Sequence, residues 1–294
     1  MSQRIFWSLA LLFVTAVWGW SFVAKHDGLG DLSASTLNAC MFIVGAASLL
    51  PFVARSLFTL QRREWQAGVL AGLVLFIAFT FQTTGLAHTT PSNAGFITGL
   101  CSVFTPLILF LSGRGRPLPK QIIGTLIALA GLALLSLDGF AFHYGDLLIL
   151  GCAIFFAVHI VVLSLFTSSA SSQVSAFLQL TTVGVLSLVW SLATNEFSLP
   201  RSGSSIMTIM IVGIVGTALA YYIQTRAQSV LPAQKVALIL ICEPVFSGIF
   251  GYFLAGDRFT AGNALGAALI LLGIAVSELR IHSGWRAPSA RRTD

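Results

Sequence analysis

The sequence predicts an all-α integral membrane protein, in which ten transmembrane helices form two inverted five-helix repeats. Three observations predict this fold: few residues are charged, the apolar runs are long, and the second half of the chain resembles the first. Of the 294 residues, 9% are charged and 56% hydrophobic, and the mean hydropathy is +0.90. Since a soluble domain carries about 25% charged residues, this composition indicates a membrane protein.

Ten apolar segments have the length that a transmembrane helix needs, which is about 17–25 residues. Their apolar runs are continuous, whereas strands of a membrane barrel alternate apolar and polar residues over about 10 positions. The linkers are short and rich in Gly, Pro, Ser, Asp and Arg, which favours turns. The predicted spans are 5–25, 33–54, 65–86, 92–112, 119–137, 145–166, 172–194, 204–225, 233–255 and 260–279.

Lysine and arginine are distributed unevenly between alternate linkers, and cytoplasmic loops carry the excess of these residues. If the N-terminus is cytoplasmic, thirteen of the sixteen lie on the cytoplasmic side, and Lys25, Arg201 and Arg258 lie outside. We therefore expect a multi-pass protein of the bacterial inner membrane with both termini in the cytoplasm. The net charge of +6 then reflects topology, so no nucleic acid is expected as a partner. The basic tail 281–294 is expected to contact anionic lipid headgroups.

Stretches in the two halves of the chain match each other at separations of about 140 residues. TTPSNAGFITGLCSVFTPLILFLSG resembles VLPAQKVALILICEPVFSGIFGYFLAG, with Pro106 of the first opposite Pro244 of the second. QIIGTLIALAG and NALGAALILLG each carry two glycines seven residues apart. Because five spans is an odd number, the second copy enters the membrane inverted. We expect repeats at 1–138 and 139–280, with a site at their interface that opens alternately to either side.

Several of these motifs resemble a known family. They are WGWSF in the first span, FQTTGLAHTTPSNAGFITGLCSVFTP in the third and fourth, and YYIQTRAQSVLPAQKVALILICEPVFSGIFGYFLAGD and NALGAALILLG in the second half. Together they resemble the drug/metabolite transporter superfamily, EamA type, over nearly the whole chain. Within it the chain is most similar to YddG-type exporters of aromatic and other neutral amino acids. The second span departs from the family, with Met41 where many relatives place an arginine.

Polar and aromatic side chains within the predicted spans are candidates for substrate contact, because such groups usually face the interior of a helical bundle. Thr15, Trp18, Phe22 and Lys25 share one face of the first span by their spacing. An aromatic packing stripe, with Lys25 at the water interface, is an alternative. Amides can instead join helices, and a single histidine can be a packing residue. The candidate substrate-binding residues are Thr15, Trp18, Asn38, Phe79, Gln82, His159, Tyr221 and Tyr222.

The stretch LILICEPVFSG places a carboxylate and a proline inside a predicted span. Pro244 lacks a backbone donor and clashes with the carbonyl of Leu240, which predicts a bend; Pro106 predicts the same bend in the first repeat without a carboxylate. Glu243, Pro244 and Pro106 are therefore candidates for coupling or gating. Glu243 is suited to binding a proton or an ammonium group. A structural role for Glu243 stays open, because the resemblance implies that relatives with different substrates share the Glu–Pro pair.

These observations predict an exporter of small metabolites that works by alternating access. Its mixture of aromatic, amide and few charged groups suits aromatic and other neutral amino acids such as phenylalanine, methionine and threonine. Organic cations or drugs are an alternative, because aromatic faces attract cations. A nucleotide-sugar or phosphometabolite carrier of the same architecture is another, and it would need paired Lys or Arg within the spans.

The motifs of nucleotide hydrolysis and of hydrolytic enzymes do not occur in the sequence. The four cysteines stand singly in apolar runs, outside any metal-ligand spacing. We therefore expect no enzyme activity, catalytic residue, metal or cofactor. We expect the chain to function as a monomer. Its expected partners are a small-molecule substrate, the lipid bilayer and, if transport is coupled, protons.

Overall fold

The computed structural model describes residues 3–113, 118–138, 141–166, 172–231, 239–240 and 242–278, and each of its helices overlaps a predicted span. The basic tail 281–294 and residues 233–238 and 241 of the ninth predicted span lie outside the described residues. In the first half the helices are α1 (Gln3–Gly28), α2 (Ala34–Leu57), α3 (Arg62–Leu86), α4 (Pro91–Thr98), α5 (Cys101–Leu111) and α6 (Pro119–Ser136). In the second half they are α7 (Tyr144–Phe166), α8 (Ser172–Ala193), α9 (Gly203–Ile211), α10 (Ala220–Val230), α12 (Cys242–Phe250) and α13 (Ala261–Glu278), with π-helical segments η1 (Val212–Leu219) and η2 (Gly251–Ala255).

The described residues contain seven helical segments that are long and apolar enough to cross a membrane. Three shorter apolar helices, Pro119–Leu135, Cys242–Ala255 and Ala261–Ser277, lie on other predicted spans. Large apolar side chains cover the outside of the bundle; Phe52, Leu111 and Phe253, for example, are 72%, 78% and 74% exposed. Such a surface is favourable only in contact with lipid. The chain is therefore a helical, multi-pass membrane protein.

Hydroxyl side chains begin several of these helices and so mark where the linkers end. A Ser or Thr at the N-cap accepts a bond from a backbone N–H that has no partner inside the helix. Ser33, Thr90, Ser202 and Thr260 each accept such a bond at the start of α2, α4, α9 and α13. Two short strands, β1 (Leu137–Asp138) and β2 (Ala141–Phe142), pair in an antiparallel manner between α6 and α7 and are the exception to the all-α prediction.

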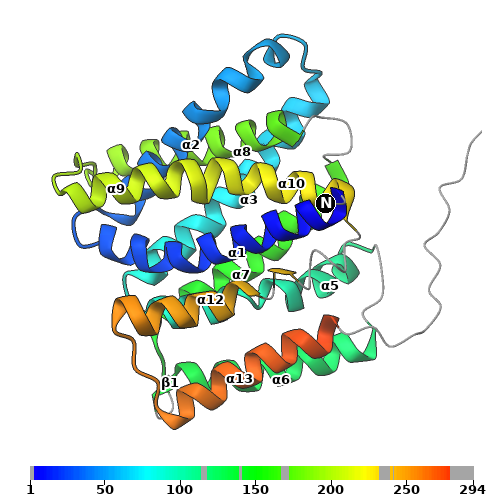
Figure 1. Ribbon diagram of the computed structural model, residues 1–294, viewed down its shortest axis with the longest axis vertical. Helices are drawn as coiled ribbons and strands as arrows, with labels where there is room; N and C mark the ends of the chain where they lie inside the picture. Colours follow the sequence, from blue (N-terminus) through cyan, green and yellow to red (C-terminus); the bar gives the residue numbers. More distant parts are fainter. Residues whose placement is uncertain are drawn as a thin grey trace, which may run out of the picture.

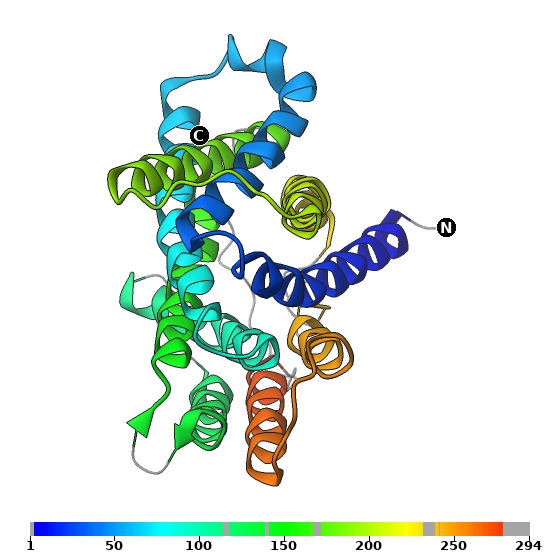
Figure 2. The ribbon, with the colours of Figure 1, turned by 90° about the vertical axis from the view of Figure 1, so that its left-hand side faces the viewer.

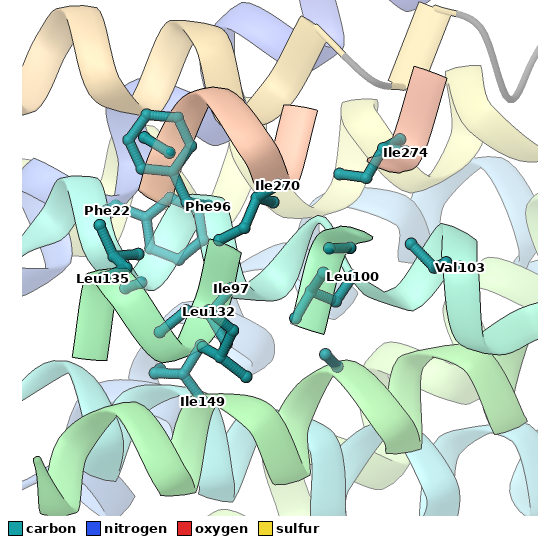
Figure 3. Packing of buried hydrophobic residues seen from close by; sticks show 14 of the residues in the cluster. Phe22, Phe96, Ile97, Leu100, Val103, Leu132, Leu135, Ile149, Ile270 and Ile274 are labelled. Carbon is teal, nitrogen blue, oxygen red and sulfur yellow. The ribbon is translucent and has the colours of Figure 1, made fainter. Parts of the chain in front are cut away.

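The helices lie roughly alongside one another across the long axis of the molecule (Figure 1). Helix α1 lies between α10 and α12, and α2 packs on α8. The pair α6 and α13 forms one end of the bundle, and Figure 2 shows the two helices side by side there. A buried hydrophobic cluster, which includes Phe22 and Phe96, joins this pair to α1, α4 and α7; Ile149 and Ile270 are 0% exposed within it (Figure 3).

Helices α6 and α13 approach each other backbone to backbone at their glycines. A Cβ atom on Gly124 would lie 2.5 Å from the carbonyl oxygen of Gly273, and one on Gly131 would lie 2.6 Å from that of Gly266. These are the two motifs in which the sequence repeats a pair of glycines seven residues apart. In an apolar solvent, such small residues permit the close packing that holds helices together.

Three predicted spans are irregular in places that the sequence did not predict. The fourth span is interrupted at Gly99 and Leu100, where α4 ends and α5 begins, rather than at Pro106, which lies inside α5. Segment η1 interrupts the eighth span, and η2 follows α12 in the ninth. Pro244 lies in the first turn of α12, which begins at Cys242, where a missing backbone donor costs little.

Candidate functional site

Aromatic side chains from five helices meet in the interior of the bundle. The ring of Phe79 on α3 lies 4.6 Å from that of Phe42 and 5.3 Å from that of Phe156, between centroids, and both pairs are edge-to-face. On the other side, the ring of Trp18 lies 5.8 Å from that of Tyr221 on α10. All five rings belong to one packed cluster, here called the aromatic cluster. It combines large apolar faces with the polar tips of Trp and Tyr.

Trp18 is also fixed by a hydrogen bond to the irregular segment of the eighth span. Its indole N–H donates to the carbonyl oxygen of Gly216 in η1, at 2.8 Å. Single π-helical turns are frequent at functional sites, because they displace the helix and redirect its backbone groups. The bond joins α1 of the first predicted repeat to the second, across 198 residues of sequence.

His159 on α7 lies beside the aromatic cluster, and one nitrogen of its imidazole ring is hydrogen-bonded to the neighbouring helix. Its Nε2 shares a hydrogen bond of 2.7 Å with Oε1 of Gln179 on α8, and Nε2 of Gln179 donates to the backbone oxygen of Ser175. His159 is 3% and Gln179 1% exposed. The imidazole lies 6.4 Å from the ring of Tyr221, between centroids. His159 is thus held in one orientation beside the cluster.

A buried lysine lies next to the same cluster. The ammonium nitrogen of Lys25 on α1 donates to Oε1 of Gln82 on α3 at 2.7 Å, and the two side chains are 4% and 3% exposed. The same nitrogen lies 4.7 Å from the ring centroid of Phe22 and 5.6 Å from that of Phe79. Both distances are within the range of cation–π attraction. Phe79 is therefore the member of the aromatic cluster that also lies beside the lysine.

The side-chain amide of Asn38 forms hydrogen bonds that join helices α2 and α3. Joining helices is the alternative role that the sequence left open for such amides. Its Nδ2 donates to the carbonyl oxygen of Phe79 at 3.2 Å, and its Oδ1 accepts from the hydroxyl of Thr83 at 2.7 Å. Both functional groups of the amide therefore have protein partners. The bond to the backbone of Phe79 orients the turn of α3 that carries this ring and Gln82.

Two further candidates are separate from this group. The hydroxyl of Thr15 donates to the carbonyl of Leu12 within its own helix, at 2.7 Å, and the side chain is 0% exposed. Tyr222 packs with Val14 and Ile223 in a second cluster, which Trp18 also contacts, and its ring is not part of the aromatic cluster. The structure brings together Trp18, Phe79, His159 and Tyr221, with Gln82 and Asn38 beside them, and leaves Thr15 and Tyr222 outside that group.

Glu243, on α12, is an acidic residue that interacts with this group of side chains through the charge of Lys25. It interacts electrostatically with Lys25 and has no hydrogen bond among the described residues. Pro244, one residue on, packs against the interruption of the fourth span: a Cβ atom on Gly99 would lie 2.5 Å from its Cγ. Pro106 lies one and a half turns further along α5, where the neighbouring Thr105 bonds to the carbonyl of Cys101. Pro244 therefore lies where α12 packs against the fourth predicted span.

Sequence reasoning missed three features of this site. It left Lys25 at the water interface as an alternative and outside the binding candidates, although the spacing put it on the face of Trp18. It passed over Gln179, an amide near the middle of the first half of the seventh predicted span. The Gly216 carbonyl had no sequence signal. Within the described ranges, no group of three or more His, Cys, Asp or Glu side chains is arranged to hold a metal ion.

An apolar helical bundle with buried aromatic, amide and charged side chains at its centre is typical of membrane transporters. The model of the EamA-like transporter family matches residues 5–137 and again residues 143–279. The chain belongs to this family, and it is a transporter rather than an enzyme.

The similarity to other proteins extends over nearly the whole chain. An uncharacterized transporter of Archaeoglobus fulgidus is 30% identical over 281 residues, which are 95% of this chain and 88% of the relative. The aromatic amino acid exporter YddG of Ancylobacter novellus is 28% identical over 286 residues, covering 92% and 97% of the two chains. A solved crystal structure aligns with a TM-score of 0.66 at 25% identity, over 92% of this chain and 96% of that one.

Proposed function

We propose that this transporter exports small metabolites across the bacterial inner membrane, and that its substrates are aromatic and other neutral amino acids such as phenylalanine, methionine and threonine. The observation that carries this proposal is the convergence of Trp18, Phe79 and Tyr221, from three helices, beside hydrogen-bonding groups. Aromatic faces bind apolar side chains, and the few polar groups fix orientation, as in small-molecule sites generally. The similarity to an exporter of aromatic amino acids supports the same substrate class.

Alternating access is the proposed mechanism. The family model matches the chain twice, in ranges that nearly equal the predicted repeats, which supports two related halves. Helices α2 and α8, which stand at equivalent positions of the two predicted repeats, pack closely on each other: a Cβ atom on Gly184 of α8 would lie 3.0 Å from the backbone nitrogen of Ile43 on α2. Contact between equivalent helices is expected where two inverted repeats pack about a pseudo-two-fold axis, and this axis is the basis of alternating access.

The buried charge disfavours the two alternative substrates. Among the described residues, Lys25 is the one buried Lys or Arg, whereas a phosphorylated substrate would call for paired cations. The ammonium of Lys25 also lies beside Phe79, so an organic cation at the aromatic cluster would meet a like charge.

Proteoliposomes test the proposal directly. Vesicles loaded with labelled phenylalanine should release it faster with the protein than without it, and unlabelled methionine or threonine should slow that release. An organic cation such as tetraphenylphosphonium and a nucleotide sugar serve as competitors for the alternatives. Equal leakage from vesicles with and without protein would refute amino-acid export.

Cysteine accessibility tests the inverted topology. In a variant without the four native cysteines, single cysteines replace Gly113, after α5, and Gly256, before α13. We expect a membrane-impermeant maleimide to label the first only from the cytoplasmic side and the second only from the outside. Labelling of both from one side would contradict the inverted repeat and alternating access with it.

A further inference from the structure

Lys25 has more hydrogen-bonding capacity than the protein uses. An ammonium group has three donors, and its contact acceptor in the structure is one neutral amide oxygen, on Gln82. Among the described residues, the faces of Phe22 and Phe79 also lie beside this nitrogen, and the thiol of Cys152 and the carboxylate of Glu243 are near it. A buried charge is costly unless it is paired with an opposite charge and hydrogen-bonded. At 4% exposure, Lys25 is therefore held in an environment that an added anion would improve.

The nearby carboxylate does not supply that contact. Glu243 lies on α12, which packs against the α1 helix of Lys25, but Glu243 is hydrogen-bonded to no described residue and Lys25 bonds to Gln82 instead. Two opposite charges on facing helices, α1 and α12, are thus near each other without forming a contact pair. A zwitterion placed between them would pair with both.

The aromatic cluster lies on the other side of the lysine. Phe79 touches both regions, because its ring lies 5.6 Å from the Lys25 nitrogen and 5.3 Å from the ring of Phe156. A ligand with a carboxylate at Lys25 would therefore extend its side chain along Phe79 toward Trp18 and Tyr221. The acidic, cationic and aromatic groups thus offer one partner each to the amino, carboxylate and side-chain groups that an α-amino acid carries on its Cα.

We propose that Lys25 is the residue that binds the substrate carboxylate, with Glu243 facing the substrate amino group and Phe79 beginning the side-chain subsite. The ligand class is then an α-amino acid with a free carboxylate and an apolar or aromatic side chain. This inference rests on the proposed function and adds to it the residue that selects the acid over its uncharged derivatives.

A matched pair of ligands tests this role: phenylalanine and phenylalaninamide, which differ by the charge of the carboxyl group. Isothermal titration calorimetry measures the binding of each to the purified full-length protein. Wild-type protein should bind the acid about tenfold or more tightly than the amide, since a desolvated charge pair contributes strongly. Lys25→Gln should abolish this preference by weakening the acid alone, and Lys25→Arg should restore part of it. Lys120→Gln, at the start of α6, is the matched control and should keep the wild-type preference.

A second variant guards against misfolding of Lys25→Gln. Gln82→Glu puts a carboxylate where the amide contacts Lys25 and should compete with the substrate carboxylate, so that affinity falls for phenylalanine more than for its amide. Equal affinity of wild-type protein for acid and amide, an equal loss of both in Lys25→Gln, or unchanged phenylalanine binding by Gln82→Glu would each overturn the assignment. If wild-type protein bound neither ligand, the proposed substrate class itself would be refuted.

Discussion

The α6–α13 pair and the aromatic cluster are both buried, but they are held together in different ways. In the pair, backbone meets backbone at Gly131 and Gly266, where there is no room for even one additional carbon atom. In the cluster, rings and hydrogen-bonding side chains such as those of Trp18 and His159 make the contacts. Backbone contacts fix one geometry, whereas side chains can exchange partners with a ligand. The difference supports our proposal that the pair is scaffold and that the substrate binds at the cluster.

Filling a glycine contact should break the scaffold and have the largest effect on stability. In Gly131→Leu, the new Cβ would lie 2.6 Å from the Gly266 carbonyl oxygen, so α6 and α13 must separate. We expect the free energy of unfolding to fall by at least about 1–3 kcal/mol, as for other overpacked contacts. Thermal unfolding in detergent, followed by size-exclusion chromatography, measures this loss.

Gly203→Leu at the start of α9 is the matched control, because a Cβ atom there has no neighbour within 4 Å. It should unfold close to the wild-type temperature. Equal unfolding temperatures for the Gly131 and Gly203 variants would show that α6 and α13 do not depend on their close approach.

Removing one hydrogen-bond partner next to the cluster should have a smaller effect. Gln179→Leu leaves Nε2 of His159 without its partner in a buried position, which costs about 1–3 kcal/mol. The unfolding temperature should therefore fall, and substrate affinity with it, because the imidazole is no longer held beside Tyr221. Gln66→Leu, at an exposed position of α3, should change neither. A Gln179 variant as stable as that control would remove His159 from the structural account.

The sequence predicted the helices well because the length of an apolar run is a local property. The predicted spans 5–25 and 172–194, for example, differ from α1 and α8 by at most three residues at either end. The interruption at Gly99–Leu100 and the π-helical segment η1 could not be predicted in this way, because they depend on which neighbouring helix packs there.

The sequence could indicate which residues belong to the candidate site, but not which of them contact one another. Trp18, Phe79 and Tyr221 were candidates because aromatic rings stand out among aliphatic residues, and the structure brings them into one cluster. The bond between Lys25 and Gln82 joins positions 57 residues apart, and only the relative rotation of α1 and α3 creates it. Spacing along one helix contains no information about that rotation.

A contact in a water-facing linker should have the smallest effect on stability. It serves as a reference for the two buried regions, the α6–α13 pair and the aromatic cluster. The carboxylate of Asp31 accepts bonds from the backbone N–H groups of Ser202 and Arg201, at 3.2 and 3.1 Å. These bonds hold the pKa of Asp31 below its usual range, the bond from Ser202 contributing most. A depressed pKa means that the contribution to stability is complete above the ordinary carboxyl pKa and disappears as the pH falls through the folded-state value.

We expect Asp31→Asn to lower the unfolding temperature slightly at neutral pH and to reduce the further loss seen when the wild-type protein is acidified below the ordinary range of a carboxyl group. Unfolding temperatures of both proteins across this range measure the difference. A wild-type curve parallel to that of Asp31→Asn would mean that the Asp31 contact does not contribute.

The measurement that tests the central claim most directly is the binding of labelled phenylalanine to purified protein in which one tryptophan at a time is replaced. Trp18 lies in the aromatic cluster, whereas Trp190 on α8 is 51% exposed on the outside of the bundle. Trp18→Leu should weaken binding about fivefold or more, since aromatic pairs contribute beyond their buried area, and Trp190→Leu should leave it within about twofold. Equal affinities of the two variants would contradict a substrate site at the aromatic cluster.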